Sequence, residues 1–225
     1  MGITTDSEIS DGKDREYPFT NQDFERIKKL IYQHAGISLS SSKQNMVYSR
    51  LARRVRANGL NSFKEYLSFL EKGSAEEWEA FTNALTTNLT AFFREQHHFP
   101  ILEHHVEQRK NQKKIPKEKL RQFFLKGKGH HAGSARVRPE LRNMITFRQL
   151  NLLDESWPIR GPFDAIFCRN VMIYFDKPTQ YKILKKFAPL LAPDGLLFAG
   201  HSESFQHASD LFKLREKTVY ELAHK

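Results

Sequence analysis

The stretch FDAIFCRNVMIYFD, from Phe163 to Asp176, places Arg169 and Asn170 directly after an almost unbroken apolar run. That run is short enough for a β-strand buried on both faces. In open parallel sheets, ligands bind beyond the carboxyl ends of the strands. A guanidinium group holds carboxylates in a fixed geometry. The pattern therefore predicts a ligand site at the end of this strand, with carboxylate recognition as its chemistry.

Ordinary structural roles for the same two residues stay open at this point. Arg169 could form an ion pair with Asp176 or with Asp154, because structural ion pairs are common at strand ends. Asn170 could form part of a turn, which is a frequent use of asparagine after a strand. Residue type alone does not decide between these roles and ligand binding.

Three arginines, Arg50, Arg53 and Arg54, share one face of a predicted helix. No acidic residue follows at the spacing that would pair with them along that helix, so their charges repel unless another group neutralises them. The pattern favours a docking face for an acidic helix, and a solvated helix face is the alternative. Nucleic acid would suit the same charge, but no nucleic-acid motif accompanies it.

Composition sets wider bounds on the chain. The 225 residues carry a net charge of +10, which favours acidic partners. No apolar run approaches the length of a membrane span, and no signal peptide pattern begins the chain, so we expect no membrane insertion. A single cysteine, Cys168, is typical of the reducing cytoplasm. The pairs His97-His98 and His104-His105 lack zinc-ligand spacing, so we expect no metal site.

The first part of the chain has the periodicity of a helical domain. We expect a disordered tail over residues 1–18 and a helical N-terminal domain over residues 19–92. Helices are predicted from the Thr20 cap to Gly36 and from about Ser42 to Gly59. Two further helices begin at capping boxes, SFKE at 62–65 and SAEE at 74–77.

The remainder, residues 93–225, has an α/β pattern. A helix starts at about His97, and a small antiparallel β subdomain is expected at about 118–148, where glycines separate short apolar pieces. Strands are then predicted at 145–151, 163–170 and 196–200 and at the terminal TVYEL, with a helix over 177–191 and the turn Pro193-Asp194-Gly195 between them.

Three motifs carry a resemblance to a known family: NALTTNLTAFFREQHHFPIL at 83–102, GPFDAIFCRNVMIYFDKPTQ at 161–180 and LLFAGHSESF at 196–205. With weaker similarity elsewhere, the chain resembles the CheR-type chemotaxis receptor methyltransferases from about Phe19 onward. The resemblance implies an enzyme that uses S-adenosylmethionine to methylate glutamate side chains of chemoreceptors. It implies a fold in which a helical N-terminal domain precedes a Rossmann-like methyltransferase domain carrying the β subdomain.

The resemblance also implies roles for individual residues. Tyr174 and Arg94 match catalytic positions, and the β subdomain matches one that grips a receptor's C-terminal tail peptide. The arginine face of residues 50–54 would dock the receptor's helical bundle. Without the resemblance, Tyr174 would be a core residue and Arg94 a solvated residue at a helix start. The residues that match cofactor contacts are Asn88, Thr90, Arg94, Asn151, Leu152, Arg169 and Asn170.

One departure from the family pattern bears on activity. In the family, a long segment lies between the β subdomain and the basic end of the helix that starts here at about His97. That segment carries the first two strands of the sheet and the acidic residue that binds the cofactor's ribose. Here EQRKNQKK runs directly into IPKEKLRQFF. We therefore expect a truncated methyltransferase domain that binds S-adenosylmethionine weakly or not at all and has little transferase activity. A shortened relative that binds receptor without methylating it is the alternative function.

Overall fold

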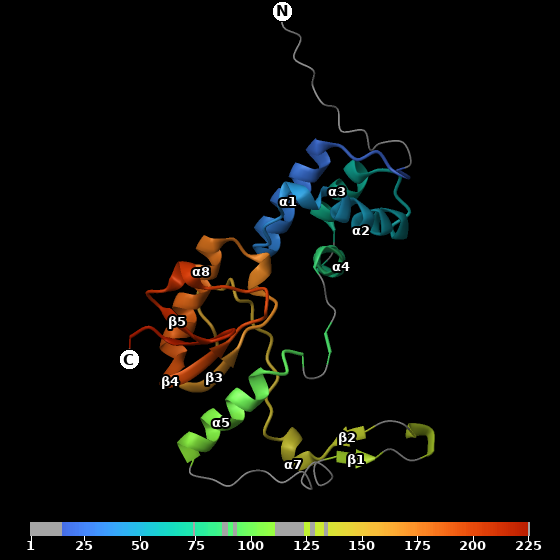
Figure 1. Ribbon diagram of the computed structural model, residues 1–225. Helices are drawn as coiled ribbons and strands as arrows, with labels where there is room; N and C mark the ends of the chain where they lie inside the picture. The colour runs from blue at the N-terminus through green and yellow to red at the C-terminus, as the bar shows by residue number, and fades with distance from the viewer. Residues whose placement is uncertain are drawn as a thin grey trace, which may run out of the picture. The chain divides into compact units, whose positions relative to one another are not determined.

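The computed structural model describes residues 15–73, 75–86, 90–91, 94–110, 124–126, 129–132 and 135–224. The chain forms two compact units (Figure 1), which are described here one at a time. The helical unit combines residues 1–92 with residues 169–184, and the sheet unit combines residues 93–168 with residues 185–225. Residues 169–184, which follow Cys168, thus cluster with the helical unit, and the domain ranges expected from the sequence, 19–92 and 93–225, stay predictions.

The helical unit is built from four helices around an apolar core. They are α1 (Asn21–Ala35), α2 (Gln44–Ala57), α3 (Phe63–Lys72) and α4 (Ala75–Leu85), with a 3-10 turn at Ser41–Lys43 before α2. Val47, Leu51 and Val55 are fully buried along α2, as their helical spacing predicts. Phe63 and Phe81 are also fully buried, from α3 and α4. Burial of these stripes is what holds the short helices together.

Side chains at the helix starts explain why the first and third helices begin where they do. The Thr20 hydroxyl accepts a hydrogen bond from the Asp23 amide (3.1 Å), and the Asp23 carboxylate accepts one from the Thr20 amide (2.9 Å), which completes a capping box. Gly36, with φ 66°, ends α1 in the left-handed conformation that glycine adopts without steric cost. At α3, Ser62 accepts from the Glu65 amide, whereas Glu65 accepts from the amide of Asn61.

The capping box predicted at 74–77 falls partly outside the described residues and stays a prediction. Ser74 lies outside the described residues, and the Glu77 carboxylate binds Arg54 and Tyr66 in the domain interior. The predicted disordered tail lies outside the described residues as far as residue 14. Residues 15–18 are instead ordered: Tyr17 packs edge-on against Phe63 with ring centroids 6.4 Å apart. The helical unit therefore begins before residue 19.

The sheet unit contains a four-stranded mixed sheet of order β3-β4-β6-β5. The strands are β3 (Phe163–Phe167), β4 (Leu191–Phe198), β5 (Phe212–Glu216) and β6 (Val219–Leu222). The pair β3–β4 is parallel, as expected from the intervening helix α8 (Lys177–Phe187), and the other two pairs are antiparallel. The alternation predicted TVYEL as a strand correctly, but β5 was missed because its residues Lys213–Glu216 are exposed and mostly polar.

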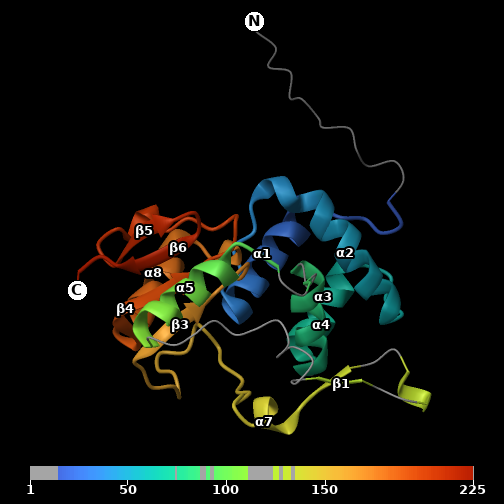
Figure 2. The ribbon, with the colours of Figure 1, turned by 60° about the horizontal axis from the view of Figure 1, so that its bottom comes forward.

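Helix α5 (His98–Lys110) packs on this sheet, and Figure 2 shows it alongside the strands. Ile101 and Leu102 contact the buried cluster of Leu196, Phe198 and Val219. Within β4, Pro193-Asp194-Gly195 is not a separate turn as predicted but a bulge, since Phe163 pairs with Leu191 and Ala165 with Leu196.

Two further predictions about this unit have different outcomes. The antiparallel piece is a hairpin of β1 (Phe124–Lys126) and β2 (Ala135–Val137), followed by the short helix α7 (Pro139–Arg142). The prediction of a strand at 145–151 is wrong, because these residues form no strand. No described strand pairs with this segment, and the Phe147 side chain is 88% exposed. The remaining 3-10 turns are at Gly129–His131, Met172–Tyr174, Ala188–Leu190 and Gln206–Ala208, so α8 ends before residue 191.

Candidate functional site at the carboxyl edge of the sheet

The parallel strands β3 and β4 end level with one another. The Cys168 amide donates to the Phe198 carbonyl (3.0 Å), which extends the pairing one residue beyond β3. Arg169 and Asn170 follow Cys168 directly, and Gly200 and His201 follow the end of β4. The chain thus leaves both parallel strands at the edge where ligands bind in sheets of this kind.

Backbone geometry explains the residue type at position 170. Asn170 has φ 61°, in the left-handed region that asparagine tolerates better than most other residues. Asn170 thus lies in the bend that follows β3, which agrees with the turn role that the sequence left open. Asp176, one of the two partners considered for Arg169, accepts hydrogen bonds from the Tyr32 hydroxyl (3.1 Å) and the Thr179 amide (2.8 Å) at the start of α8. Hydrogen bonds from Thr179 are the largest cause that lowers the pKa of Asp176, and the bond from the Tyr32 hydroxyl lowers it further.

Tyr174 lies in the helical unit and is partly buried against its core. Its carbonyl accepts a hydrogen bond from the Ser38 amide (2.8 Å), so the 3-10 turn that carries it is attached to the loop after α1. The core role that residue type favoured is thus present. A catalytic role would have to use the exposed part of the same side chain.

Of the matched residues before α5, Asn88 lies outside the described residues, Thr90 is exposed and Arg94 is partly buried. Glu95, the residue after Arg94, is held by hydrogen bonds from His201. Glu95 has a side chain only 8% exposed, and one of its carboxylate oxygens accepts hydrogen bonds from the His201 amide (3.1 Å) and from the His201 ring Nδ1 (2.7 Å). Burial alone would raise the pKa of Glu95, but the hydrogen bonds from His201 outweigh it and lower that pKa.

Sequence reasoning missed the pair of Glu95 and His201, although both residues stand inside the family motifs, in AFFREQHH and AGHSES. Their separation of 106 positions hides the contact from any local pattern. What could have pointed to them is that each follows a position already assigned to the site: Glu95 follows Arg94, and His201 follows the end of a predicted strand.

The thiol of Cys168 is not available as a nucleophile. Burial raises its pKa to about 12, and the nearby Glu203 carboxylate adds to the shift. A thiol with such a pKa stays protonated near neutral pH. The chemistry at this edge therefore uses groups other than a thiolate.

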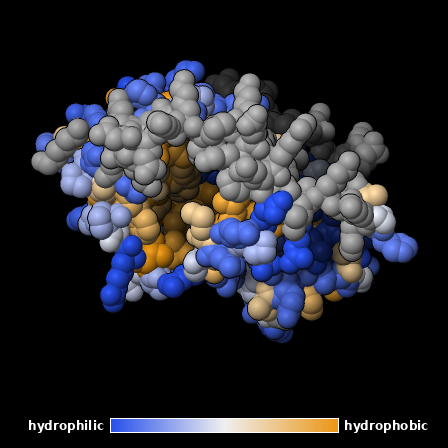
Figure 3. Space-filling model, turned by 90° about the horizontal axis from the view of Figure 1, so that it is seen from below, coloured by the Kyte–Doolittle hydropathy of each residue, from blue (hydrophilic) through white to orange (hydrophobic). Residues whose placement is uncertain are grey.

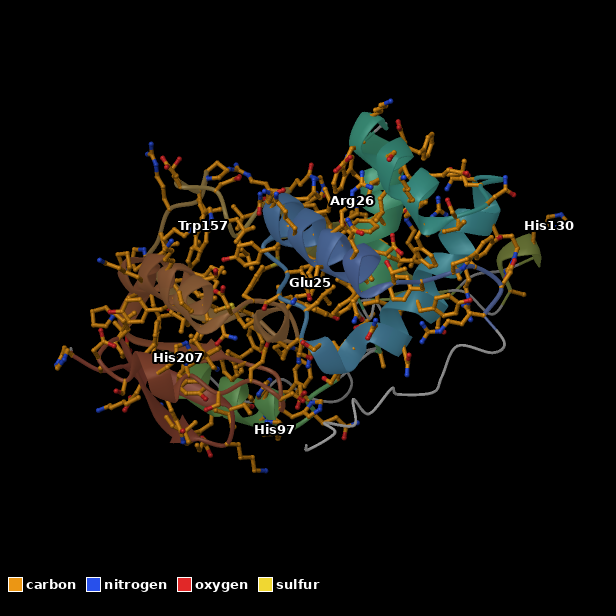
Figure 4. All side chains as sticks on the ribbon, turned by 90° about the horizontal axis from the view of Figure 1, so that it is seen from above. Glu25, Arg26, His97, His130, Trp157 and His207 are labelled. Atoms are coloured by element: carbon orange, nitrogen blue, oxygen red, sulfur yellow. The ribbon has the colours of Figure 1, made fainter. Side chains whose placement is uncertain are left out.

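Asn151 and Leu152 lie in a tight turn that is anchored by its own side chains. The Asn151 side-chain oxygen accepts from the Leu153 amide (3.0 Å), and its carbonyl accepts from the Trp157 indole (3.1 Å). The ammonium of Lys186 donates to the Leu152 carbonyl (2.8 Å) and lies 4.5 Å from the Trp157 ring. Figure 4 shows Trp157 close to helix α8. These hydrogen bonds hold the turn in place, although the strand expected before it does not form.

The arginine face of α2 is less uniform than its spacing suggests. Arg54 forms a two-pronged ion pair with Glu77, and Arg50 donates to the carbonyls of Ala84 and Thr86 at the end of α4. Residues at and just after α4 thus supply partners for two of the three arginines, a carboxylate for Arg54 and backbone carbonyls for Arg50, and the docking face for an acidic helix stays a prediction. Only Arg53 of the three is exposed.

A cavity of about 1010 Å³ lies elsewhere in the sheet unit. Its lining includes Trp157 and Phe163 and the arginines Arg148 and Arg160. Phe163 begins β3, so this cavity is at the amino end of the strand whose carboxyl end carries Arg169. None of the predicted cofactor contacts lines it. We therefore place the candidate site by the strand ends and not by the size of this cavity.

Within the described ranges, no group of three or more His, Cys, Asp or Glu side chains is arranged to hold a metal ion. In the same ranges, no helix combines the length and the apolarity required to cross a bilayer. The face seen in Figure 3 mixes hydrophilic and apolar side chains.

Comparison with known families defines the class first. Residues 22–86 match the family described as "CheR methyltransferase, all-alpha domain", and residues 107–221 match "CheR methyltransferase, SAM binding domain". The first match lies within the helical unit, and the second covers most of the sheet unit together with residues 169–184, which cluster with the helical unit.

Individual relatives agree with this class. The chain is 45% identical to the chemotaxis protein methyltransferase of Salmonella typhimurium over 258 aligned residues, covering 89% of this chain and 90% of the relative. It is 43% identical to the Escherichia coli protein of the same description and 42% identical to chemotaxis protein methyltransferase 2 of Pseudomonas aeruginosa, with similar coverage. The chain belongs to the CheR methyltransferase family and is, by this homology, a protein-glutamate O-methyltransferase that uses S-adenosylmethionine.

Proposed function

We propose that this chain methylates glutamate side chains of chemoreceptors and that the carboxyl edge of β3 and β4 is where the cofactor's methionine end binds. The proposal is supported above all by the placement of Arg169 and Asn170 directly after Cys168, whose amide continues the pairing of β3 with β4. Family membership supports the proposed reaction, and the ends of β3 and β4 support the proposed location of the cofactor site.

The residues at this edge suit a methionine carboxylate and the side chain of a substrate glutamate. Arg169 offers a guanidinium group and Asn170 an amide directly after the end of β3, and Arg94 remains proposed as a second guanidinium through its motif. S-adenosylmethionine supplies the methyl group as a sulfonium. A glutamate carboxylate is ionised near neutral pH, so the chain need not supply a general base. Its task is to align the two reactants and exclude water, which agrees with a site whose cysteine is protonated.

The adenosine end of the cofactor has weaker support. Two carboxylates lie at the edge, and both accept hydrogen bonds within the protein: Glu95 from His201 and Glu203 from the Gly200 amide. The described residues therefore offer no spare carboxylate at this edge for the ribose hydroxyls. Asn151 and Leu152 remain proposed contacts through the turn that carries them, and Asn88 and Thr90 remain proposed through the motif alone.

The lengths in the comparison favour a second candidate function. The alignment with the Salmonella typhimurium protein spans 258 residues, whereas 89% of this 225-residue chain is about 200 residues. About 58 aligned positions thus have no residue of this chain opposite them, which supports an internal segment missing relative to the family. A chain without that segment would bind receptor without methylating it.

Calorimetry with S-adenosylhomocysteine separates the two candidates. Micromolar binding at one-to-one stoichiometry, with transfer of labelled methyl groups to receptor glutamates, would support the methyltransferase. Losing one charge-assisted contact to ribose weakens binding by about one to two orders of magnitude. We expect weak binding for that reason, and a complete absence of binding together with intact receptor binding would favour the second candidate.

For the receptor, we propose that Arg53 on α2 contacts the acidic helical bundle and that the β1–β2 hairpin contacts the C-terminal tail of some receptors. Arg53 is the exposed arginine of its face, whereas Arg50 and Arg54 stabilise the packing of α2 on α4. We further propose that the protein acts in the cytoplasm, where the single, buried Cys168 would stay reduced.

A further inference from the structure

Glu95 adopts an unusual backbone conformation for its residue type. Its φ is 60°, and only Asn170 and Lys217 share a positive φ among the described non-glycine residues. The left-handed region disfavours a residue with a long side chain, so the surrounding structure must hold it there.

The restraint on Glu95 comes from the end of β4. His201 contacts the Glu95 carboxylate twice, through its amide and through its ring, and the carboxylate is almost completely buried. His97 Nδ1 lies 3.9 Å from the other carboxylate oxygen. A buried carboxylate with two donors is a strong anchor, because leaving it without them would cost its full desolvation penalty.

A second attachment lies two residues further on. The Nε2 atoms of His97 and His98 lie 3.1 Å and 2.8 Å from the Thr218 hydroxyl, and the Thr218 carbonyl accepts from the Ala199 amide (2.9 Å). Figure 4 shows His97 next to the start of α5. Residues 95–98 are therefore attached both to the loop after β4 and to the turn before β6.

We propose that the pair of Glu95 and His201 positions Arg94 at the cofactor edge of the sheet. Consecutive Cα atoms are about 3.8 Å apart, so the backbone of Arg94 cannot move independently of Glu95. The pair acts on the cofactor only through Arg94, which makes both members positioning residues. This inference rests on the proposed cofactor role of Arg94 and adds the device that fixes its direction.

Two substitutions of the same histidine separate positioning from general stability. His201→Asn keeps a donor close to the position of ring Nδ1, whereas His201→Gln places its amide near the position of Nε2. The His201 amide donates in both variants. His224→Gln, at an exposed histidine near the chain end, is the matched control for loss of an imidazole.

The first measurement is calorimetry with S-adenosylhomocysteine on the full chain. We expect His201→Gln to weaken binding roughly tenfold and His201→Asn less than about threefold, as loss or retention of one charge-assisted bond predicts. In an Arg94→Ala background, His201→Gln should have no further effect, because coupled residues are non-additive. Equal losses in the Asn and Gln variants, or full additivity with Arg94→Ala, would overturn the proposal.

Amide hydrogen exchange of residues 94–98 tests the pair without the cofactor. Exchange should rise in His201→Gln and stay near the wild-type rate in His201→Asn and His224→Gln. If wild-type protein fails to bind S-adenosylhomocysteine while exchange follows this pattern, the cofactor role of this edge fails and the restraint on residues 94–98 stands. Unchanged exchange in His201→Gln would refute the pair itself.

Discussion

Among the described residues, Glu77 in the helical unit and Glu95 in the sheet unit each have a little-exposed carboxylate bound by a basic side chain, and the basic residues differ. In the helical unit, Glu77 is bound by Arg54 and by the hydroxyl of Tyr66 (2.7 Å). In the sheet unit, Glu95 is bound by His201, with His97 beside it. Arginine is always charged, whereas histidine changes charge within the physiological pH range. The first arrangement suits a permanent structural connection and the second a site that must keep its geometry near a ligand.

The helical unit also contains a simpler charge interaction, made by Arg26 of α1, which is labelled in Figure 4. Arg26 pairs with Glu71 of α3 at 2.6 Å, with both side chains about a third or more exposed. Exposed pairs of this kind contribute little to stability. The comparison between units therefore concerns the two buried carboxylates.

The largest expected effect is on the helical unit. Glu77→Ala leaves Arg54 partly buried without its partner and removes the acceptor for the Tyr66 hydroxyl. We expect a loss of roughly 2–4 kcal/mol in the free energy of unfolding, as for other broken buried pairs. The chain's two tryptophans allow local measurement, since Trp78 reports on the helical unit and Trp157 on the sheet unit. Denaturant unfolding followed by Trp78 in a Trp157→Phe background gives the value.

The control is Glu79→Ala, at an exposed glutamate on the same helix. We expect a change below about 0.5 kcal/mol there, because α4 keeps its length and its buried face. If Glu79→Ala costs as much as Glu77→Ala, helix propensity and not the buried ion pair would account for the loss.

A pair of glycines gives the next effect and tests the sheet unit. A Cβ at Gly161 would lie 3.0 Å from the Leu190 backbone, whereas a Cβ at Gly59 would meet nothing within 4 Å. Gly161→Ala should therefore cost about 1–3 kcal/mol through overpacking. Gly59→Ala should cost about 1 kcal/mol through its φ of +65° alone. Denaturant unfolding followed separately by Trp78 and Trp157 should show the lost stability in the unit that carries each substitution. A larger loss of stability for Gly59→Ala than for Gly161→Ala would contradict the close approach of Gly161 to Leu190.

Acid pH should weaken both units. The pKa values of Glu77 and Glu95 are lowered in the folded chain from an ordinary value of 4.5: burial would raise both, and their hydrogen-bonding partners more than reverse it. A lowered folded-state pKa stabilises the protein above pH 4.5, and this stabilisation is lost as pH falls through the folded-state pKa. We expect Glu77→Gln and Glu95→Gln each to flatten the fall in unfolding free energy between pH 5 and pH 3, because each removes a carboxylate whose pKa is lowered by folding.

Because the two carboxylates lie in different units, their effects should add in the double variant. A fall in stability that is as steep in the double variant as in wild type would show that other carboxylates control acid unfolding. Unfolding followed separately by Trp78 and Trp157 shows which unit each substitution affects.

The two units also differ in how far the sequence predicts them. The helices were predictable because their signals are local: Thr20 with Asp23, Gly36, and the buried stripe of Val47, Leu51 and Val55 all lie within a few turns. The sheet unit depends on pairing between distant residues. The apolar segment 145–151 looks like a strand in isolation, yet it forms none, because a strand requires a partner and not only the right residue types.

The candidate site shows the same limit. Arg169 and Asn170 could be found from the end of one apolar run, and their place beyond β3 agrees with that pattern. Glu95 and His201 could not, because their contact joins two motifs 106 positions apart. The arginine face of α2 shows a related limit: its spacing was correct, but Glu77 and the end of α4 take up Arg54 and Arg50 from outside the helix.

The smallest effect on stability belongs to Arg53, where the interest lies in binding. Arg53→Glu reverses one exposed charge and should change the unfolding free energy by less than about 0.5 kcal/mol, since the side chain is exposed on α2. Binding to the receptor's acidic helical bundle should weaken several-fold at low salt, and the difference should shrink as salt rises toward 0.5 M because exposed charges are screened. Surface plasmon resonance across a salt series measures this.

Lys64→Glu, on the exposed face of α3, is the matched control: it makes the same change of net charge on a different helix. Equal weakening in both variants would indicate attraction by net charge alone, whereas a larger effect for Arg53→Glu would place the receptor on α2. Binding that neither substitution nor salt alters would remove α2 from the docking surface.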